Sequence, residues 1–472
     1  MRSQVHLFWA LFFVAGVLVN DVHAEQQQQL PDLGAASAHV LSPHQEKQIG
    51  EIVLLNLRRG PLTKDPIIKY FVESHLQGIA QYSDLRDFNL KLVTVESKQL
   101  NAFAIPGGVI GINLGLILSA QDVHEYSSVI AHELAHLSQR HHARSMQQQS
   151  NLVVQNLVGF IASAVLIAAG GTEPGFATIM GTEALVQGQA LAFSRSHEIE
   201  ADRVGFNTLV KAGYDPFGAT RMFERMHQKY RYQRALPEYF STHPLTVNRI
   251  ADMRSEAEKL TIETKEYQPS KDYQNLRSKI KVLAAEAPAD AIAVAEDETD
   301  PYGLAYAYSR DNQHELAVEQ MSRAYSESEN SIFLAASYAE ILMDAEKAQE
   351  ALDLLDKWLF DYPDHTLLSL LKCDALKRLN RVEESVKILS KQAQLNKTDH
   401  DIWFKLAEHA GMIDNLTVAY RARAEYHALR GEFDDSLRQL QHAKRLAGDN
   451  FRLNATLDQR ILDLREYAAA LE

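Results

Sequence analysis

A repeat of 34 residues in the C-terminal part of the chain constrains the fold more than any other feature of the sequence. Small residues recur at this interval at two positions of the repeat, and a large apolar residue recurs at a third. The small residues are Ala305, Ala339, Cys373 and Ala407, and then Ala317, Ala351, Ser385 and Ala419; the large residues are Met321, Leu355 and Leu389. Small side chains at this spacing let paired helices cross closely, and each pair buries its apolar face against the next. The sequence therefore predicts an all-α solenoid over residues 301–472, ending in a capping helix near Leu471.

The repeat resembles the tetratricopeptide pattern, with Pro363 at a turn that ends one repeat. Arrays of this kind present a concave surface to extended peptides or partner proteins. Cys373 is the one cysteine of the chain, so no disulfide can form within it, and packing in the repeat is sufficient to explain this residue.

A second feature, His132-Glu133-Leu134-Ala135-His136, specifies a chemistry. On a helix, His132 and His136 lie one turn apart on the same face and can bind one metal ion. Glu133 lies beside them, where it can act as a general base on a water molecule. Apolar residues on both sides of the motif predict a buried helix. The pattern is that of a zinc hydrolase, which needs a third ligand from elsewhere in the chain.

The segment 194–202 supplies that ligand. Glu198 and Asp202 are four residues apart and share one helical face, so Glu198 can bind the metal while Asp202 accepts a hydrogen bond from a ligand histidine. Two histidines and one glutamate form the ligand set of a catalytic zinc site, with one zinc ion per chain. Glu200 points away from this face on the same geometry.

His142 is the rival third ligand, because it follows His132 by the ten residues that the metzincin pattern requires. Gln139 stands where that pattern needs a glycine, which favours Glu198. His141 and His142 are then expected to be solvated or to lie behind the ligands.

His243, in the sequence Ser241-Thr242-His243-Pro244, is a further candidate. One interpretation is a helix-capping or surface histidine. The other places it over the metal, either as a donor to the oxyanion of the tetrahedral intermediate or as a reversible plug in the open zinc position. The sequence does not separate these roles.

The remaining regions set the domain boundaries. Residues 1–24 read as a cleavable signal peptide, which predicts a periplasmic or secreted protein, and 25–41 as a flexible lead. Helices are expected over 42–58 and 65–82, and strands over 90–95, 101–105 and 109–113 in a small antiparallel sheet. Residues 42–260 are assigned to the peptidase domain and 261–300 to a charged connector with a helix over 272–283. The formal net charge of −14 argues against a nucleic-acid partner.

An extended substrate could add to an edge of this sheet near the metal. The simpler interpretation is that the strands only support the fold. The apolar stretch 152–169 is predicted to be a helix that either covers the active site or touches a membrane.

The motifs together resemble the gluzincin metallopeptidases related to the CAAX prenyl protease and the HtpX-type membrane protease, over roughly residues 42–260. The residues that carry the resemblance are His132 to His136, Asn101 to Gly108, Ser194-Arg195 with Glu198 and Ala201-Asp202, and Thr242-His243-Pro244 with Arg249. The fold class that follows is an α+β zincin-type domain, mostly helical with a small antiparallel sheet, before the tetratricopeptide solenoid.

A gluzincin domain before such repeats in a signal-bearing chain resembles a family of soluble periplasmic proteases. This resemblance implies that misassembled outer-membrane proteins are degraded and their assembly assisted by a chaperone activity. It also implies docking on the β-barrel assembly machinery through the repeats. A zinc-bearing scaffold with dormant proteolysis is the alternative, and a secreted digestive peptidase is disfavoured because it has no use for the repeats.

Overall fold

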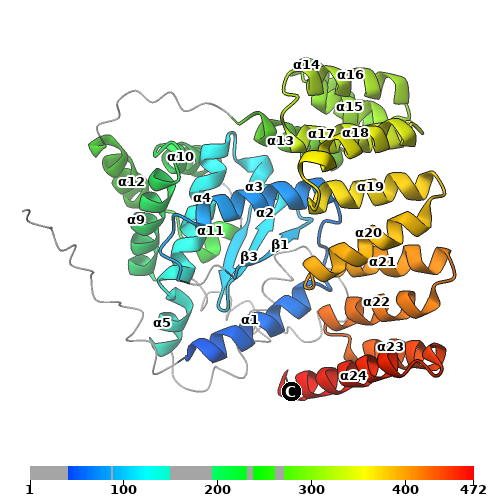
Figure 1. Cartoon of the computed structure of the whole chain (residues 1–472). Coiled ribbons are helices and arrows are strands. Elements are labelled where there is room, and N and C mark those ends of the chain that lie inside the picture. The colour runs from blue at the N-terminus through cyan, green and yellow to red at the C-terminus, as the bar shows by residue number, and fades with distance from the viewer. Residues whose placement is uncertain (1–40, 87–88, 149–193, 231–237, 261–269, 472) are drawn as a thin grey trace, which may run out of the picture.

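The computed structural model describes residues 41–86, 89–148, 194–230, 238–260 and 270–471. The predicted signal peptide, most of the lead and the apolar stretch 152–169 lie outside these ranges. In Figure 1 the described chain has two parts, a peptidase domain of helices around a small sheet and a curved stack of helices beside it. No described helix is both long enough and apolar enough to cross a membrane.

The peptidase domain begins with two capped helices. Helix α1 covers Pro43–Leu57 and is preceded by Ser42, whose hydroxyl accepts a hydrogen bond from the Gln45 amide in a capping box. Helix α2 covers Pro66–Ala80 and begins after Asp65, whose carboxylate accepts hydrogen bonds from two first-turn amides. Both helices confirm the predicted positions because a polar N-cap before proline is a strong start signal.

Three strands form the sheet in the order β1-β3-β2: β1 (Lys91–Val95), β2 (Ala102–Ile105) and β3 (Val109–Asn113). The predicted strand positions are confirmed, but the expectation of a wholly antiparallel sheet is wrong. Strands β2 and β3 form an antiparallel hairpin through Gly107 and Gly108, which have positive φ angles of 83° and 82°. Strand β3 is central and all of its residues are buried, and β1 pairs with its other side in parallel.

The helices that follow the sheet carry the candidate site. They are α3 (Leu114–Ser119), α4 (Val123–Ser138), α5 (His141–Gln148), α9 (Arg195–Lys211), α10 (Gly218–Tyr230), α11 (Glu238–Thr242) and α12 (Val247–Lys259). Helix α4 runs through the middle of the domain and packs against the sheet, α2, α9 and α10 (Figure 1). Its residues from Val123 to His136 are all buried.

The helical stack begins before residue 301. Of the expected connector 261–300, two segments form helices, α13 (Lys271–Ala284) and α14 (Pro288–Asp297), and both pack on α15. The stack continues with α15 (Pro301–Arg310), α16 (His314–Ser326), α17 (Ile332–Asp344), α18 (Ala348–Asp361), α19 (Thr366–Arg378) and α20 (Val382–Leu395). It ends with α21 (His400–Met412), α22 (Leu416–Leu429), α23 (Phe433–Ala447) and α24 (Phe451–Leu471). Cys373 is fully buried in this stack, as the packing interpretation expects.

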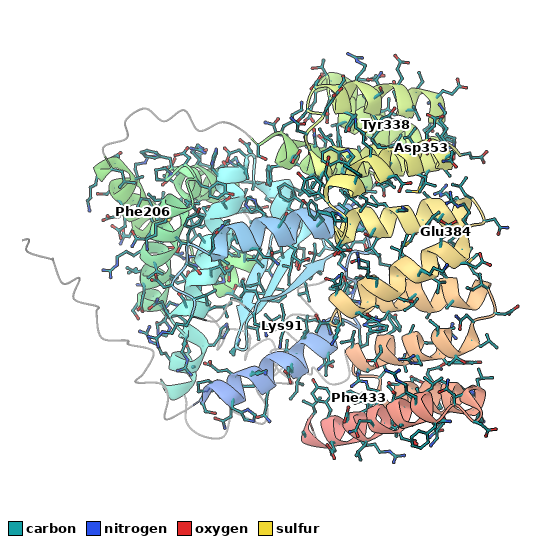
Figure 2. The ribbon with its side chains drawn as sticks, in the orientation of Figure 1. Lys91, Phe206, Tyr338, Asp353, Glu384 and Phe433 are labelled. Atoms are coloured by element: carbon teal, nitrogen blue, oxygen red, sulfur yellow. The ribbon has the colours of Figure 1, made fainter. Side chains whose placement is uncertain are left out.

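The stack covers one side of the peptidase domain, against α1, α2 and the β1 side of the sheet (Figure 1). Arg58 and Arg59 at the end of α1 donate to backbone carbonyls of Leu429, Arg430 and Gly431. The buried Lys279 forms ion pairs of 2.7 Å with both Asp65 and Glu340 and so ties the domain to the stack. Figure 2 shows that Asp353 and Glu384 lie on the opposite side, away from the peptidase domain.

Candidate metal centre

Helix α4 brings two imidazole nitrogens to one point. Asp122 caps the helix by accepting hydrogen bonds from two first-turn amides, and the helix then carries His132 and His136 one turn apart. Their Nε2 atoms are 2.9 Å from each other, and both side chains are buried. The predicted helix and the predicted convergence of these two residues are both present.

Helix α9 brings Glu198 to the same point. Its carboxylate oxygens lie 3.5 Å from His132 Nε2 and 3.3 Å from His136 Nε2. The two helices can approach this closely because Gly205 of α9 faces α4, where an added Cβ would lie only 3.0 Å from the Ala131 carbonyl oxygen. The glutamate is almost fully buried, which places a negative charge among the imidazoles.

His243 contributes a fourth donor atom. It follows the short helix α11, and its Nδ1 lies 3.4 Å from His132 Nε2 and 3.1 Å from a Glu198 oxygen. One donor atom from each of the four side chains lies within 4.8 Å of all the others. Ligands about 2.1 Å from a tetrahedral zinc ion lie about 3.4 Å from one another. The separations of 2.9 to 3.5 Å, in which both Glu198 oxygens take part, are close to this spacing.

The electrostatics of the centre favour a cation. Although burial opposes its charged form, hydrogen bonds with Asp202 and Glu198 raise the pKa of His132 to about 10. Burial also opposes ionisation of Glu198, but the neighbouring His243, His132 and His136 hold its pKa far below the ordinary value. A buried carboxylate that stays ionised among imidazoles is a suitable place for a divalent metal ion.

Glu133 lies beside the donor atoms and not among them. It is fully buried, and one carboxylate oxygen lies 3.5 Å from His243 Nε2. Neither oxygen accepts a well-formed hydrogen bond from a described residue. Burial raises its pKa, while the charges of His243 and His132 and the nearby Tyr239 hydroxyl partly oppose this effect.

Asp202 and Arg249 hold His132 from behind. The Asp202 carboxylate lies 3.0 Å from His132 Nδ1 and accepts two hydrogen bonds of 2.7 Å from the Arg249 guanidinium. Arg249 also lies 2.6 Å from Glu198 and donates to the backbone carbonyl of Pro244. One buried arginine of α12 therefore links the ligand helix α9 to the residue that follows His243.

His136 has a different partner, His141, for which the sequence left open a position in solvent or behind the ligands. Its Nδ1 lies 2.9 Å from Nδ1 of His141, and His141 Nε2 lies 3.2 Å from Glu200. Arg144 donates to the same Glu200 oxygen at 2.7 Å. Since His136 presents the lone pair of Nε2 to the centre, its Nδ1 donates to His141, which in turn donates to Glu200. Glu200 is therefore no ligand, but it supports one.

The turn between α4 and α5 decides between the two positions that the sequence left open for His141. Arg140 has a positive φ of 53°, which ends α4 and directs α5 back toward the metal helix. A positive φ at arginine has no clear sequence signal. His141 is fully buried, whereas His142 Nε2 donates to the Ala104 carbonyl oxygen at 2.7 Å and is directed away from the donor atoms.

Comparison with known proteins agrees with this geometry. Residues 70–257 match the sequence profile of Peptidase family M48, so the chain carries an M48 metallopeptidase domain and is a metalloprotease of that type.

Relatives in curated collections extend the match to nearly the whole chain. The chain is 26% identical over 454 residues to the Beta-barrel assembly-enhancing protease of Escherichia coli (strain K12), covering 94% of this chain and 92% of that protein. It is 29% identical over 453 residues to the Putative beta-barrel assembly-enhancing protease of Vibrio cholerae, covering 92% and 91%. The Mitochondrial metalloendopeptidase OMA1 of Arabidopsis thaliana is 33% identical over 171 residues, which is 36% of this chain and 30% of that protein. The chain is thus a homologue of the β-barrel assembly-enhancing proteases.

Proposed function

We propose that the chain is a zinc metalloendopeptidase in which His132, His136 and Glu198 hold the ion. The observation that carries this proposal is the tetrahedral spacing of the buried donor atoms. Two imidazoles and one carboxylate form a donor set typical of catalytic zinc. Asp202 and His141 each hold the Nδ1 side of one histidine, which keeps both Nε2 lone pairs directed at the centre.

Glu133 is the proposed general base. A zinc ion at this centre supplies a Lewis acid that polarises the scissile carbonyl and lowers the pKa of a water molecule. Glu133 accepts the proton of the attacking water and later delivers it to the leaving amine. Burial raises the pKa of Glu133, which favours acceptance of a proton by its carboxylate.

His243 is the proposed fourth ligand in a closed state of the site. Its Nδ1 stands at the remaining vertex of the tetrahedron, and its Nε2 faces Glu133. A peptide carbonyl needs that vertex, so His243 must withdraw before hydrolysis. The position of His243 where a peptide carbonyl would bind supports the role of a reversible plug over that of an oxyanion donor.

The substrates and location are proposed from the relatives and from the sequence. By analogy with the named β-barrel assembly-enhancing proteases, the chain degrades misassembled outer-membrane β-barrel proteins and promotes their assembly as a chaperone in the periplasm. The helical stack would be a tetratricopeptide array that docks on the assembly machinery. Peripheral membrane contact through residues 152–169 is part of the same proposal.

A scaffold with dormant proteolysis is the second candidate function. The position of His243 at the fourth vertex favours it, because a site closed in this way does not admit a peptide. The two candidates differ in whether hydrolysis is needed for rescue of outer-membrane protein assembly in cells that lack the parent chain. A Glu133→Gln form that rescues as well as the parent would favour the scaffold.

The direct test is metal analysis together with a casein cleavage assay on the purified mature chain. We expect one zinc ion per chain and measurable cleavage. Glu133→Gln should retain the zinc and lose cleavage by about a hundredfold or more, as expected for loss of a general base. A purified Glu133→Gln protein with undiminished activity would refute the assignment of Glu133. A chain that binds no zinc would refute the assignment of the metal.

A further inference from the structure

The two outer edges of the sheet have different surroundings. At the β2 edge, His142 of α5 donates to the Ala104 carbonyl oxygen, and α4 packs beside the strand. The β1 edge faces the helical stack, as the position of Lys91 in Figure 2 shows. The β1 edge is therefore remote from the donor atoms and has an environment of its own.

The register of the sheet determines which backbone groups of β1 are available. Lys91 donates its amide to the Gly108 carbonyl of the β2–β3 turn, and its Cα partner in β3 is Val109. In a parallel pair, alternate residues direct both backbone groups toward the partner strand. Lys91, Val93 and Val95 therefore bond to β3, while Leu92 and Thr94 direct their amide and carbonyl groups to the outer side.

The chain itself already adds a short extended segment to this edge. Leu62 forms an antiparallel bridge with Val95; the Thr63 amide donates to the Thr94 carbonyl at 3.0 Å, and the Glu96 amide donates to the Pro61 carbonyl at 2.8 Å. The segment then turns away into α2. Among the described residues, the backbone amide and carbonyl of Leu92 have no hydrogen-bond partner. The edge thus accepts extended backbone in antiparallel register, and this pairing stops just before Leu92.

A cavity of about 540 Å³ lies beside the open part of the edge. Residues 89–94 form one wall, and the other walls come from α1, residues 62–63, α2, the start of α21, the end of α22, and α24. Four residue steps from Leu90 to Thr94 span about 13 Å, which leaves room for a short extended segment. Leu55 of α1 and Leu464 of α24 supply apolar surface opposite the strand.

The charges nearest the edge are paired with one another. Lys69 forms ion pairs with Asp399 and Asp401 at 3.6 and 2.6 Å, and Lys91 lies 3.9 Å from Glu51. Besides these pairs, the cavity is lined by the unpaired backbone of Leu92, by apolar side chains and by further charged side chains such as Lys47 and Glu73. A polypeptide segment can supply both backbone hydrogen bonds for the strand edge and side chains for the cavity walls.

We propose that the outer edge of β1 binds an extended segment of an unfolded polypeptide, which adds antiparallel to Leu92 within the cavity between the sheet and the helical stack. The segment continues the line of residues 61–63, and its residue opposite Leu92 exchanges two backbone hydrogen bonds with it. Alternating apolar and polar side chains suit the walls of the cavity. The site deepens the proposed peptidase function, because it would hold substrate apart from the metal centre, but binding itself needs no hydrolysis.

Proline scanning of β1 provides a matched test. The Leu92 amide is directed outward, so Leu92→Pro removes a donor for the incoming peptide and leaves the β1–β3 hydrogen bonds in place, as edge strands tolerate. Val93→Pro removes an amide that bonds to β3 and should lower the melting temperature of the protein. Both changes are made in the Glu133→Gln full-length mature chain, so that the bound peptide is not cleaved.

The probe is a fluorescein-labelled ten-residue peptide of alternating Val and Thr with a lysine at each end, followed by fluorescence anisotropy. We expect saturable binding, at least about fivefold weaker in Leu92→Pro with the melting temperature preserved. The same peptide with three alternate amides N-methylated should bind weakly to both proteins. Equal binding by the parent and a folded Leu92→Pro variant would overturn the proposal.

Cross-link mapping tests the proposed site without a proline substitution, so it does not depend on the folding of those variants. A photoreactive group at the centre of the peptide should label residues 89–94 or α24 of the Glu133→Gln chain. Labelling confined to residues 101–105, or no saturable binding at all, would overturn the proposed site. Loss of casein cleavage by the active chain would instead count against the proposed peptidase function alone.

Discussion

The metal centre and the helical stack differ in the kind of contacts that their buried residues make. In the stack, each helix pair packs mainly against its neighbours through small and apolar residues such as Ala339 and Leu355. In the centre, buried charged and polar groups come together from α4, α5, α9, α12 and the segment after α11. A residue of the stack can therefore be replaced locally, whereas a charge in the centre depends on partners that are far apart in sequence.

The largest expected effect is on stability at the centre. Arg249 is 5% exposed and neutralises both Asp202 and Glu198. Arg249→Met should lower the free energy of unfolding of the metal-free protein by about 3–5 kcal/mol, because two buried carboxylates lose the counter-charge of the guanidinium. Urea denaturation measures this change.

An ion pair of the stack is the matched control for this prediction. Lys372 pairs with the half-exposed Asp356, so Lys372→Met should change the free energy of unfolding by less than about 1 kcal/mol. Equal losses of unfolding free energy in Arg249→Met and Lys372→Met would contradict the view that buried charges matter more in the centre than in the stack.

The next effect is on metal affinity. Burial and the nearby His197 lower the pKa of His141 to about 3, so at neutral pH it is an uncharged acceptor for His136. His141→Ala should weaken zinc binding by about 10- to 100-fold, measured by competition with a chromophoric chelator. Its neighbour offers the control, since the His142 side chain donates to the Ala104 carbonyl and His142→Ala should keep zinc affinity within about threefold. The reverse order of effects would show that His141 does not support the ligand.

A smaller change is expected from opening the fourth position. His243→Ala should cleave unfolded casein several times faster than the parent at equal zinc content, because a peptide carbonyl no longer competes with the imidazole. Initial rates under saturating substrate measure the effect. Slower cleavage with zinc still bound would instead assign His243 to stabilisation of the transition state.

The smallest effect is expected for a substitution in the helical stack. Cys373 is buried and its thiol lies 3.7 Å from the Ser385 carbonyl oxygen, with a pKa that burial raises to about 12. Cys373→Ala should cost about 1 kcal/mol or less in unfolding free energy and leave zinc content and cleavage unchanged. A large loss of activity in this variant would show that the stack and the centre are more tightly coupled than their packing suggests.

Much of the fold follows from local pattern. The caps of α1 and α2, the period-two strands and the repeat all depend on residues close in sequence, and these elements lie where they were predicted. The sheet order did not follow from pattern, because a strand's alternation does not show which neighbour it pairs with. Within 271–297 the helix α13 was predicted and α14 was not, since α14 lies in a charged region and begins after Ala287, which makes no capping hydrogen bond.

The sequence by itself determined the chemistry of this protein. The spacing of His132 and His136, the helical face shared by Glu198 and Asp202, and the 34-residue repeat are one-dimensional patterns with direct physical meaning. Only the tertiary structure decided how these parts meet. It brings His243 Nδ1 close to the other donor atoms, places His141 behind His136, and lets Arg249 contact both α9 and the segment after His243. It also leaves an open strand edge that faces the helical stack. The contacts of the metal centre join residues up to 111 positions apart, and their geometry depends on helix packing and turns that no local spacing encodes.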